Sequence, residues 1–179
     1  MNTDHYPSAW ERIGRTRDGV QFRIRPIRPD DAGRERQFID ALSPQSRYQR
    51  FMHELHDPSG PLIEKMVNVD YRRTMAFVAM IRDGDAEQIV GVARYAATDD
   101  QGLDCEFAVA IADEWQLRGV GTTLMRLLFD YARSQGFTQT HGPILAANMH
   151  MLELAHDLGL TMRHVPDDWG AVEALGAIR

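Results

Sequence analysis

Residues 106–123 read Glu-Phe-Ala-Val-Ala-Ile-Ala-Asp-Glu-Trp-Gln-Leu-Arg-Gly-Val-Gly-Thr-Thr. The stretch begins as an alternating strand, passes through a short connection and ends in a turn that contains two glycines, Gly119 and Gly121. Helical spacing follows as far as Gly136, with apolar side chains on one face at Val120, Leu124, Leu127, Leu128 and Tyr131. The sequence therefore predicts a strand, a glycine-containing turn and an amphipathic helix in direct succession.

This turn has the chemistry of an anion site. The first turn of a helix leaves backbone N–H groups unpaired, and Gly119 and Gly121 let a phosphate approach without a Cβ clash. The motif is not a dinucleotide fingerprint, because Leu124 stands where the third glycine would be, and no Gly-Lys-Ser/Thr follows to make a P-loop. A glycine-rich helix start without any ligand explains the same residues equally well. The pattern favours a pyrophosphate site but does not require one.

Strands precede this stretch. Residues 75–81 and 89–95 form a predicted hairpin of largely buried strands, and residues 103–111 add a third antiparallel strand. An earlier strand over 21–28 is expected at a sheet edge, because Pro26 cannot donate to a ladder. Residues 1–20, which contain Asp18-Gly19, are interpreted as an arm that ends in a turn. Regular structure is therefore expected to begin after residue 20.

Helix signals fill the remaining segments. Helices are predicted after Asp30-Asp31 and after Ser43-Pro44, and further ones over 61–69 and 148–158. A short strand near 143–146 and a terminal pair over 161–165 and 172–177 complete the chain. Together they predict an α/β (α+β) fold with a mixed, mostly antiparallel sheet of about 6–7 strands and about 4–5 flanking helices. The predicted organisation is one domain over 21–179 that follows the arm 1–20.

Composition excludes several classes of protein. The chain has 179 residues, with 20 basic and 26 acidic side chains and a formal net charge of −6, which argues against nucleic-acid binding. Its longest apolar run, 75–81, is far short of the ~20 residues that a membrane span needs, and the first residues resemble no secretory signal. We therefore expect a cytoplasmic protein without nucleic-acid or membrane partners. A single cysteine, Cys105, excludes an internal disulfide, and His53 and His56 lack a third ligand, so no metal is expected.

The spacing of Gln116, Gly119 and Gly121 resembles the signature of the GNAT superfamily of acetyl-CoA-dependent N-acetyltransferases: Gln or Arg, two residues, Gly, one residue, Gly or Ala. The order of predicted elements is similar to the GNAT fold from about residue 20 onward. Finer blocks resemble the branch that acetylates protein lysines and is often fused to an acyl-CoA-synthetase-like domain. They are 25–31, 42–44, Arg47-Tyr48, Arg50-Phe51, Asp70 and 106–109.

The resemblance implies a binding site for acetyl-CoA as co-substrate. Backbone groups of Val109 and Ile111 would hold the pantetheine arm by strand-like pairing. The pyrophosphate would lie on the loop and first helical turn formed by Gln116, Leu117, Arg118, Gly119, Val120, Gly121, Thr122 and Thr123. Asn148, at the start of the following helix, stands where family members place an asparagine beside the cofactor, and it is equally suited to be the helix N-cap.

The resemblance also assigns Glu106 as the general base. A base is needed because a free lysine, with a pKa near ~10.4, is almost entirely protonated at pH 7. Partial burial would raise the pKa of Glu106 toward a useful range, and a bridging water could relay the proton. A solvated strand carboxylate without function is the alternative. Many family members carry a tyrosine as general acid where this chain has Ala155, so the group that protonates the departing thiolate stays open.

The sequence therefore predicts an acetyl-CoA-dependent N-acetyltransferase whose acceptor is a lysine on a protein substrate. Acidic residues between Asp99 and Glu114 would attract such a cationic amine, and a pair of solvated turns explains the same residues without any role in binding. Two alternatives remain, an enzyme that acetylates a small-molecule amine and a silent acyl-CoA-binding regulatory module. The target, the acyl-chain preference, the regulation and the choice between monomer and homodimer are not readable from the chain.

Overall fold

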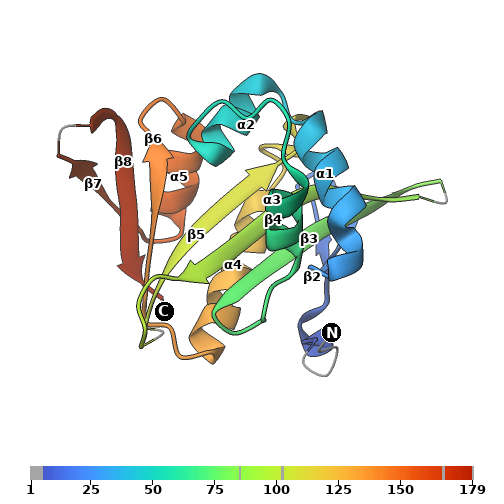
Figure 1. Ribbon diagram of the computed structural model, residues 1–179, viewed down its shortest axis with the longest axis horizontal. Helices are drawn as coiled ribbons and strands as arrows, with labels where there is room; N and C mark the ends of the chain where they lie inside the picture. Colours follow the sequence, from blue (N-terminus) through green and yellow to red (C-terminus); the bar gives the residue numbers. More distant parts are fainter. Residues whose placement is uncertain (1–5, 85, 102, 167, 179) are drawn as a thin grey trace.

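The computed structural model describes residues 6–178 except Asp85, Gly102 and Asp167. Its centre is an eight-stranded sheet with the order β1-β2-β3-β4-β5-β6-β8-β7 (Figure 1). Neighbouring strands are antiparallel except for β5 and β6, which are parallel. The strands are β1 Arg12–Arg15, β2 Gln21–Pro26, β3 Thr74–Asp83, β4 Ala86–Ala97, β5 Asp104–Ile111, β6 Gln139–Leu145, β7 Thr161–Val165 and β8 Asp168–Ala177.

Helices cover both faces of the sheet. They are α1 Ala32–Ala41, α2 Pro44–Phe51, α3 Gly60–Val67, α4 Val120–Ser134 and α5 Met149–Asp157. Helices α1 and α3 pack together on one face, where Phe38, Ile63 and Val67 meet Val78 and Val92. Helices α4 and α5 belong to the core of the opposite face. Helix α2 lies near the carboxyl ends of β5 and β6, where Figure 1 shows those two strands moving apart.

Serine and asparagine caps begin the short helices. The Ser43 side chain accepts a hydrogen bond from the Ser46 backbone N–H, and Pro44 occupies the first turn. Ser59 caps α3 in the same way, and the Asn148 side chain accepts from the Met151 N–H at the start of α5. These caps explain why the helices start where the sequence predicts, within a residue or two.

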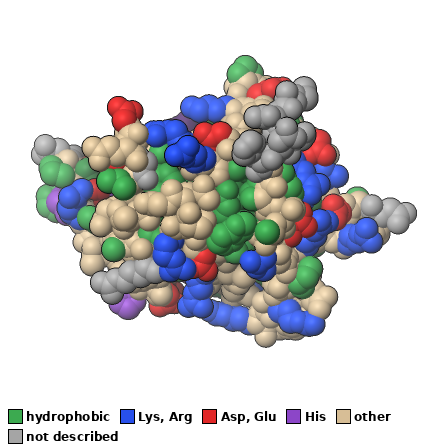
Figure 2. Space-filling view, turned by 90° about the horizontal axis from the view of Figure 1, so that it is seen from below, with side chains coloured by type: hydrophobic (Ala, Val, Ile, Leu, Met, Phe, Trp, Pro, Cys, Tyr) green, Lys and Arg blue, Asp and Glu red, His purple; other side chains and the backbone are tan. Residues whose placement is uncertain are grey.

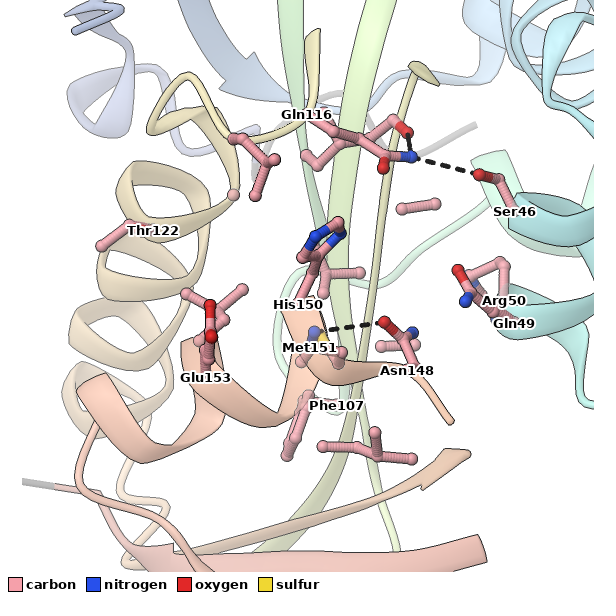
Figure 3. A pocket seen from close by; sticks show the side chains of 18 of the residues that line it. Ser46, Gln49, Arg50, Phe107, Gln116, Thr122, Asn148, His150, Met151 and Glu153 are labelled. Carbon is pink, nitrogen blue, oxygen red and sulfur yellow. Dashed lines mark hydrogen bonds between the residues drawn. The ribbon is translucent and has the colours of Figure 1, made fainter. Parts of the chain in front are cut away.

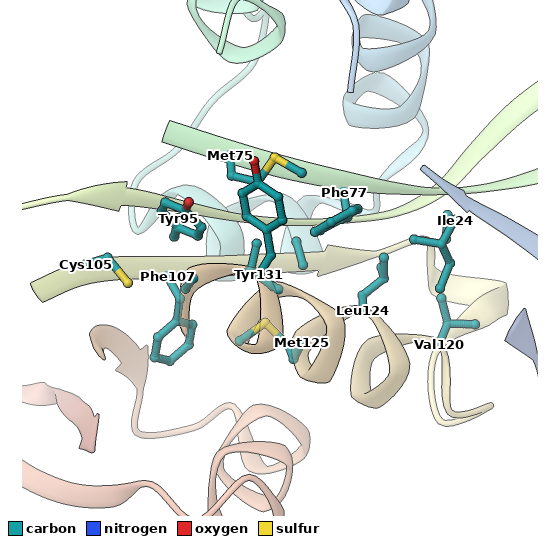
Figure 4. Packing of buried hydrophobic residues seen from close by; sticks show 14 of the residues in the cluster. Ile24, Met75, Phe77, Tyr95, Cys105, Phe107, Val120, Leu124, Met125 and Tyr131 are labelled. Atoms are coloured by element: carbon teal, nitrogen blue, oxygen red, sulfur yellow. The ribbon is translucent and has the colours of Figure 1, made fainter. Parts of the chain in front are cut away.

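The larger core lies between the sheet and α4. Val120, Leu124, Met125 and Tyr131 of that helix are buried and point toward the sheet (Figure 4). The Tyr131 ring meets the edge of Phe77 with centroids 5.7 Å apart. Because the packed face of α4 runs the length of the helix, it fixes where the helix begins. The helix begins at the turn that the sequence predicts to be an anion site.

The predicted fold class is confirmed, with a mixed, mostly antiparallel sheet and five α-helices among the described residues. The strand count is one above the expected range. The extra strand is β1, which pairs with β2 inside the segment that sequence analysis interpreted as an arm. The expectation that regular structure begins after residue 20 is therefore wrong. Residues 1–5 of that arm lie outside the described residues.

The expected edge position of the strand over 21–28 is also wrong, because β2 lies between β1 and β3. Its pairing with β1 ends at Ile24, whereas Pro26 pairs only with Phe77 of β3. Pro26 therefore sits beyond the reach of β1, and its missing N–H costs no ladder bond on that side. Pro26 therefore marks the end of the pairing between β1 and β2, and not an edge strand.

The parallel strands β5 and β6 pair over only a short length. The register pairs Asp104–Glu106 with Gln139–His141, and no further pair follows although both strands continue. At the point of divergence Gly142 lies against Phe107: a Cβ on Gly142 would stand 2.9 Å from the Phe107 carbonyl oxygen. A glycine here allows the two backbones to touch at the bottom of the gap before they separate.

The face seen in Figure 2 carries acidic and basic side chains interspersed, without a field of one sign. In the described part of the chain, no helix is both long enough and apolar enough to cross a bilayer. Likewise, within the described ranges no group of three or more potential metal-binding side chains comes together.

The close approach at Gly142 predicts an effect on stability. Gly142→Ala should destabilise the fold by about 1–3 kcal/mol, because the new Cβ meets a backbone oxygen that cannot move without shifting β5. Urea unfolding measures this directly. Gly33→Ala is the matched control: nothing lies within 4 Å of its added Cβ in α1, so it should stabilise by about 0.5–1 kcal/mol. Equal midpoints for the two variants would contradict the packing described here.

A second prediction concerns acid. Arg25 donates to both oxygens of Asp31 at 2.6 Å, and both side chains are buried. Burial, the largest single effect, would raise the pKa of Asp31, but the bonds from Arg25 and from the Arg28 N–H and the charges of Arg25 and Arg34 together outweigh it and lower the pKa. Asp31→Asn should therefore cost about 3–5 kcal/mol at pH 7, since it leaves the buried Arg25 charge without its carboxylate partner, although Arg25 keeps its hydrogen bond to the Pro26 carbonyl.

The stabilisation from Asp31 is present above its unfolded pKa near ~3.9 and is lost as pH falls through the lower folded pKa. The gap between wild type and Asp31→Asn in urea midpoints should thus narrow below about pH 4. The exposed Asp40 in α1 provides the control, since Asp40→Asn should leave the midpoint at pH 7 nearly unchanged. A gap that is constant with pH would contradict the lowered pKa.

Candidate active site

A cavity of about 330 Å³ lies where β5 and β6 diverge. Its walls are β5, the start of α4, helix α5 and helix α2 (Figure 3). In this view Thr122 of α4 lies across the cavity from Gln49 and Arg50 of α2, while His150 and Met151 of α5 lie between them. Its place between β5 and the start of α4, where the sequence predicts an anion site, makes it the main candidate for a ligand site.

The β5 wall offers backbone groups as well as side chains. The Ala112 N–H donates to Val90 of β4, at 2.9 Å. Because N–H and C=O groups alternate in direction along a strand, those of Val109 and Ile111 face the opposite side, toward β6. There β6 has already diverged. Within the described part of the chain, the Ile111 carbonyl accepts from the Gln116 side chain, and no partner is found for the backbone groups of Val109. Val109 therefore presents a strand edge to the cavity.

The connection before α4 has unusual backbone geometry. Leu117 has φ 59° although it is not a glycine, and Gly119 has φ 91°. Left-handed backbone at a bulky residue is strained and collects at functional sites. The N-cap Gly119 provides no side-chain cap, so the N–H groups of the first turn, Val120–Thr122, point out of the helix unpaired among the described residues. This geometry makes a concave cluster of donors.

Most of the predicted loop residues line the cavity: Gln116, Leu117, Gly119, Gly121 and Thr122. Three do not. Val120 is fully buried in the core, Thr123 donates its hydroxyl to the Gly119 carbonyl, and the Arg118 side chain binds Asp18. The contribution of Val120 to an anion site is thus restricted to its backbone.

Gln116 braces the loop. Its amide donates to the Ile111 carbonyl and to the Ser46 hydroxyl, each at 3.1 Å (Figure 3). Ser46 and Ser43 in turn donate to the Asp113 carboxylate at 2.7 Å. Burial raises the pKa of Asp113, but the donors on both serines more than compensate, so the pKa is lowered. Helix α2 is therefore anchored to the same connection that leads into α4.

Asn148 is the N-cap of α5 and also lines the cavity. Its side-chain oxygen accepts from the Met151 N–H at 3.2 Å, which confirms the N-cap interpretation, and the residue lines the cavity. The amide nitrogen remains available toward the cavity. Ala155, on the same helix, is fully buried and does not line it. A larger side chain at position 155 would thus enter the hydrophobic core that α5 packs against, and not the cavity.

Glu106 lines the cavity beside the point where β5 and β6 part. The burial that sequence analysis considered for it is absent, because the residue is exposed. Two residues earlier on the same face, the Asp104 carboxylate lies 3.2 Å from His141 Nδ1 and accepts its hydrogen bond when that nitrogen carries a proton. His141 is the register partner of Glu106. Of the acidic residues expected to attract a cation, Asp104 and Asp113 therefore already have partners, and Glu106 faces the cavity.

Arg50 is an unpaired cation in the wall formed by α2. Its guanidinium lies 4.9 Å from the centre of the Phe51 ring, and it has no hydrogen bond or ion pair within the described residues. Burial and the nearby Arg94 lower the pKa of Arg50 to about 10, against the opposing effect of Glu35 and Glu106. It stays charged at neutral pH, so a positive charge stands near Glu106.

Cys105 is buried beside Thr140, on the strand face opposite Glu106, as its alternation with Glu106 predicts. Burial raises the pKa of its thiol to about 11. A buried, protonated thiol is a poor acyl carrier. Cys105 is a core residue, which confirms the sequence-based interpretation.

Sequence reasoning missed the roles of two groups of cavity residues. Ser46, Gln49 and Arg50 share one face of α2 at helical spacing, so a polar stripe on a short helix was the available signal. Arg17 reaches the cavity from the β1–β2 turn, where its backbone N–H donates to the Arg118 carbonyl at 2.9 Å. No local pattern could reveal that contact, because the two residues are distant in sequence.

The model of the acetyltransferase (GNAT) family matches residues 37–160. Acetyltransferase PA5475 of Pseudomonas aeruginosa is 43% identical over 151 residues, which cover 84% of this chain and 81% of that protein. Acetyltransferase Pat of Mycolicibacterium smegmatis is 29% identical over 156 residues, and the match covers 87% of this chain but only 45% of Pat.

Among solved structures, the GNAT domain of S. lividans PAT superimposes with a TM-score of 0.88 at 27% identity, covering 97% of this chain and 99% of that domain. The resemblance first recognised in Gln116, Gly119 and Gly121 is thereby confirmed. This chain belongs to the acetyltransferase (GNAT) family.

Proposed function

We propose that this protein transfers the acetyl group of acetyl-CoA to lysine side chains of a protein, with Glu106 as general base. The observation that carries the proposal is the exposed carboxylate of Glu106 at the open side of a cavity whose other end is a helix start rich in free N–H groups. Enzymes of this family use acetyl-CoA. Bound in the cavity, acetyl-CoA would supply an activated thioester.

The residues present suit such a co-substrate. The unpaired N–H groups of Val120–Thr122 and the positive end of the α4 dipole favour a pyrophosphate. The free strand edge at Val109 suits the amide groups of a pantetheine arm, which can add to β5 where β6 has left it. The Asn148 amide lies along the same path. A Cβ on Gly121 would make only van der Waals contacts with Leu154 and Ile111, so packing within the protein does not by itself require a glycine there.

Glu106 and Arg50 act on the acceptor amine in complementary ways. An exposed carboxylate attracts the ammonium form and takes its proton, directly or through water. The positive charge of Arg50 disfavours an ammonium beside it, which lowers the pKa of the amine and increases its neutral fraction. The neutral nitrogen then attacks the acetyl carbon and loses its second proton to water as the amide bond forms. The C–S bond breaks, and the thiolate departs to be protonated by water.

The exposure of this end of the cavity favours a protein over a small amine as acceptor. Glu106 is exposed there, and the α2 residues that line the cavity, among them Gln49 and Arg50, are only half-buried. A small amine would call for an enclosed pocket that surrounds most of its surface. An open wall instead leaves room for a lysine that enters on a larger body. Glu106 and Arg50 place two opposite charges at the end of the cavity where the acceptor would enter. These charges disfavour a silent acyl-CoA-binding module, which would not need them.

The function is tested by incubating a deacetylated bacterial lysate with isotope-labelled acetyl-CoA and quantifying labelled lysines by mass spectrometry. Wild type should concentrate label on a few lysines. Glu106→Gln should reduce that label about 10²–10⁴-fold, because the proton acceptor is lost, while acetyl-CoA affinity changes little.

Asp104→Asn is the matched control for this experiment: it removes a carboxylate from the same face of β5, two residues away, and should retain wild-type labelling. Label at the enzyme-free level with wild type would exclude lysine acetylation. Equal labelling by wild type and Glu106→Gln would exclude the assigned base and leave the transfer itself standing.

The role of Arg50 predicts a shift in the pH profile. In Arg50→Gln the acceptor amine loses its cationic neighbour, its pKa rises, and the rising limb of kcat/KM should move to higher pH by about one unit. Arg133→Gln, which removes an exposed arginine at the end of α4, should leave the limb in place. If the rising limb of the kcat/KM profile stays at the same pH in Arg50→Gln, the charge of Arg50 does not affect the pKa of the acceptor amine.

A further inference from the structure

Arg118, the arginine in the loop before α4, is engaged in an ion pair outside the cavity. Arg118 donates to the Asp18 carboxylate at 2.6 Å, and its guanidinium lies 4.5 Å from the centre of the Trp115 ring. The bond from Arg118 lowers the pKa of Asp18 to about 2, so the pair stays charged near neutral pH. The side chain does not line the cavity. The cation that sequence reasoning placed at the pyrophosphate therefore holds the β1–β2 turn instead.

That turn brings a different arginine to the same place. The backbone N–H of Arg17 donates to the Arg118 carbonyl at 2.9 Å, and its side chain lines the cavity beside Leu117 and Gly119. The Arg17 Cγ lies 3.7 Å from where a Cβ on Gly119 would stand. Its guanidinium makes one long contact, 3.5 Å to the Leu117 carbonyl. A guanidinium has five N–H donors, so most of its donor capacity is free within the described residues.

The surrounding charges make Arg17 the cation at this end of the cavity. Of the described residues that line it, only Arg17 and Arg50 are arginines, and Arg50 lies near Glu106. The α5 wall contributes Glu153 and Asp157, which repel an anion. Among the described residues that line the cavity, a phosphate on the Val120–Thr122 N–H groups would thus find its side-chain countercharge in Arg17, which comes from outside the loop motif.

We propose that Arg17 binds a phosphate group of the CoA nucleotide, and that Asp18 positions it by clasping Arg118. The inference rests on the proposed use of acetyl-CoA and extends it to a residue outside the family motif. Free donors of a guanidinium form charge-assisted, often bidentate bonds to phosphate oxygens. The phosphate is either the pyrophosphate or the ribose 3′-phosphate, because both carry the chemistry that Arg17 recognises.

The test is the dissociation constant of acetyl-CoA by calorimetric titration at low ionic strength. Arg17→Ala should raise it about tenfold, and kcat at saturating acetyl-CoA should stay near wild type. Arg17→Lys should recover part of the loss. Arg15→Ala is the matched control, because it removes an exposed arginine from the same hairpin that does not line the cavity, and it should bind as wild type does.

The two phosphates are distinguished with acetyl-CoA that lacks the 3′-phosphate. If Arg17 binds the 3′-phosphate, wild type and Arg17→Ala should bind this analogue with the same dissociation constant. If it binds the pyrophosphate, the tenfold loss should persist with the analogue. Either result supports the proposal. The backbone bond from Arg17 survives substitution, and unchanged urea midpoints confirm that the variants are folded.

Several outcomes would overturn the inference. Equal losses of acetyl-CoA affinity in Arg17→Ala and Arg15→Ala would show that general positive charge, and not a direct contact, favours binding. Unchanged affinity in Arg17→Ala would show that its guanidinium makes no bond to the ligand. Both leave the proposed function intact. Failure of the wild-type protein to bind acetyl-CoA would instead overturn the proposed function, and the inference with it.

Discussion

The early parting of β5 and β6 is the constraint on which the site depends. The strands touch where Gly142 meets the Phe107 carbonyl and then diverge, which leaves the β6-facing edge of β5 without a backbone partner. In a continuous parallel ladder those groups would be satisfied within the sheet and no cavity would exist. A single glycine, by allowing contact at the bottom of the gap, therefore sets the depth of the cavity and the point at which the exposed Glu106 emerges.

One polar cluster holds the two walls of that cavity in register. Asp113 accepts from Ser43 and Ser46 at the start of α2, and Gln116 joins Ser46 to the end of β5. Thus the helix that carries Arg50 and the loop that precedes α4 share an anchor. The arrangement explains how a helix without any fully buried residue keeps a fixed position over the cavity. Polar bonds replace the apolar packing that anchors α1 and α3.

Sequence reasoning predicted the features that have a local cause. The α4 stripe, the caps at Ser43 and Asn148, and the glycines of the loop follow from spacing and side-chain chemistry within a few residues, and all are found as expected. Strand β1 was missed because its pattern is short and its Gly14 fits only against the Phe22 ring. The turned-away Arg118 was also beyond local reasoning. Its partner Asp18 belongs to a hairpin whose position is decided by tertiary packing.

The bond between Arg17 and Arg118 joins two segments separated by roughly 100 positions along the chain. Such a contact raises the contact order and forms only after the sheet has closed around α4. A partly folded chain, or a translation intermediate that ends before α4, consequently lacks this contact. Under the proposed function, acetyl-CoA would bind the native ensemble alone and shift the folding equilibrium toward it by mass action. The supply of acetyl-CoA in the cell would then help to determine how much native protein persists.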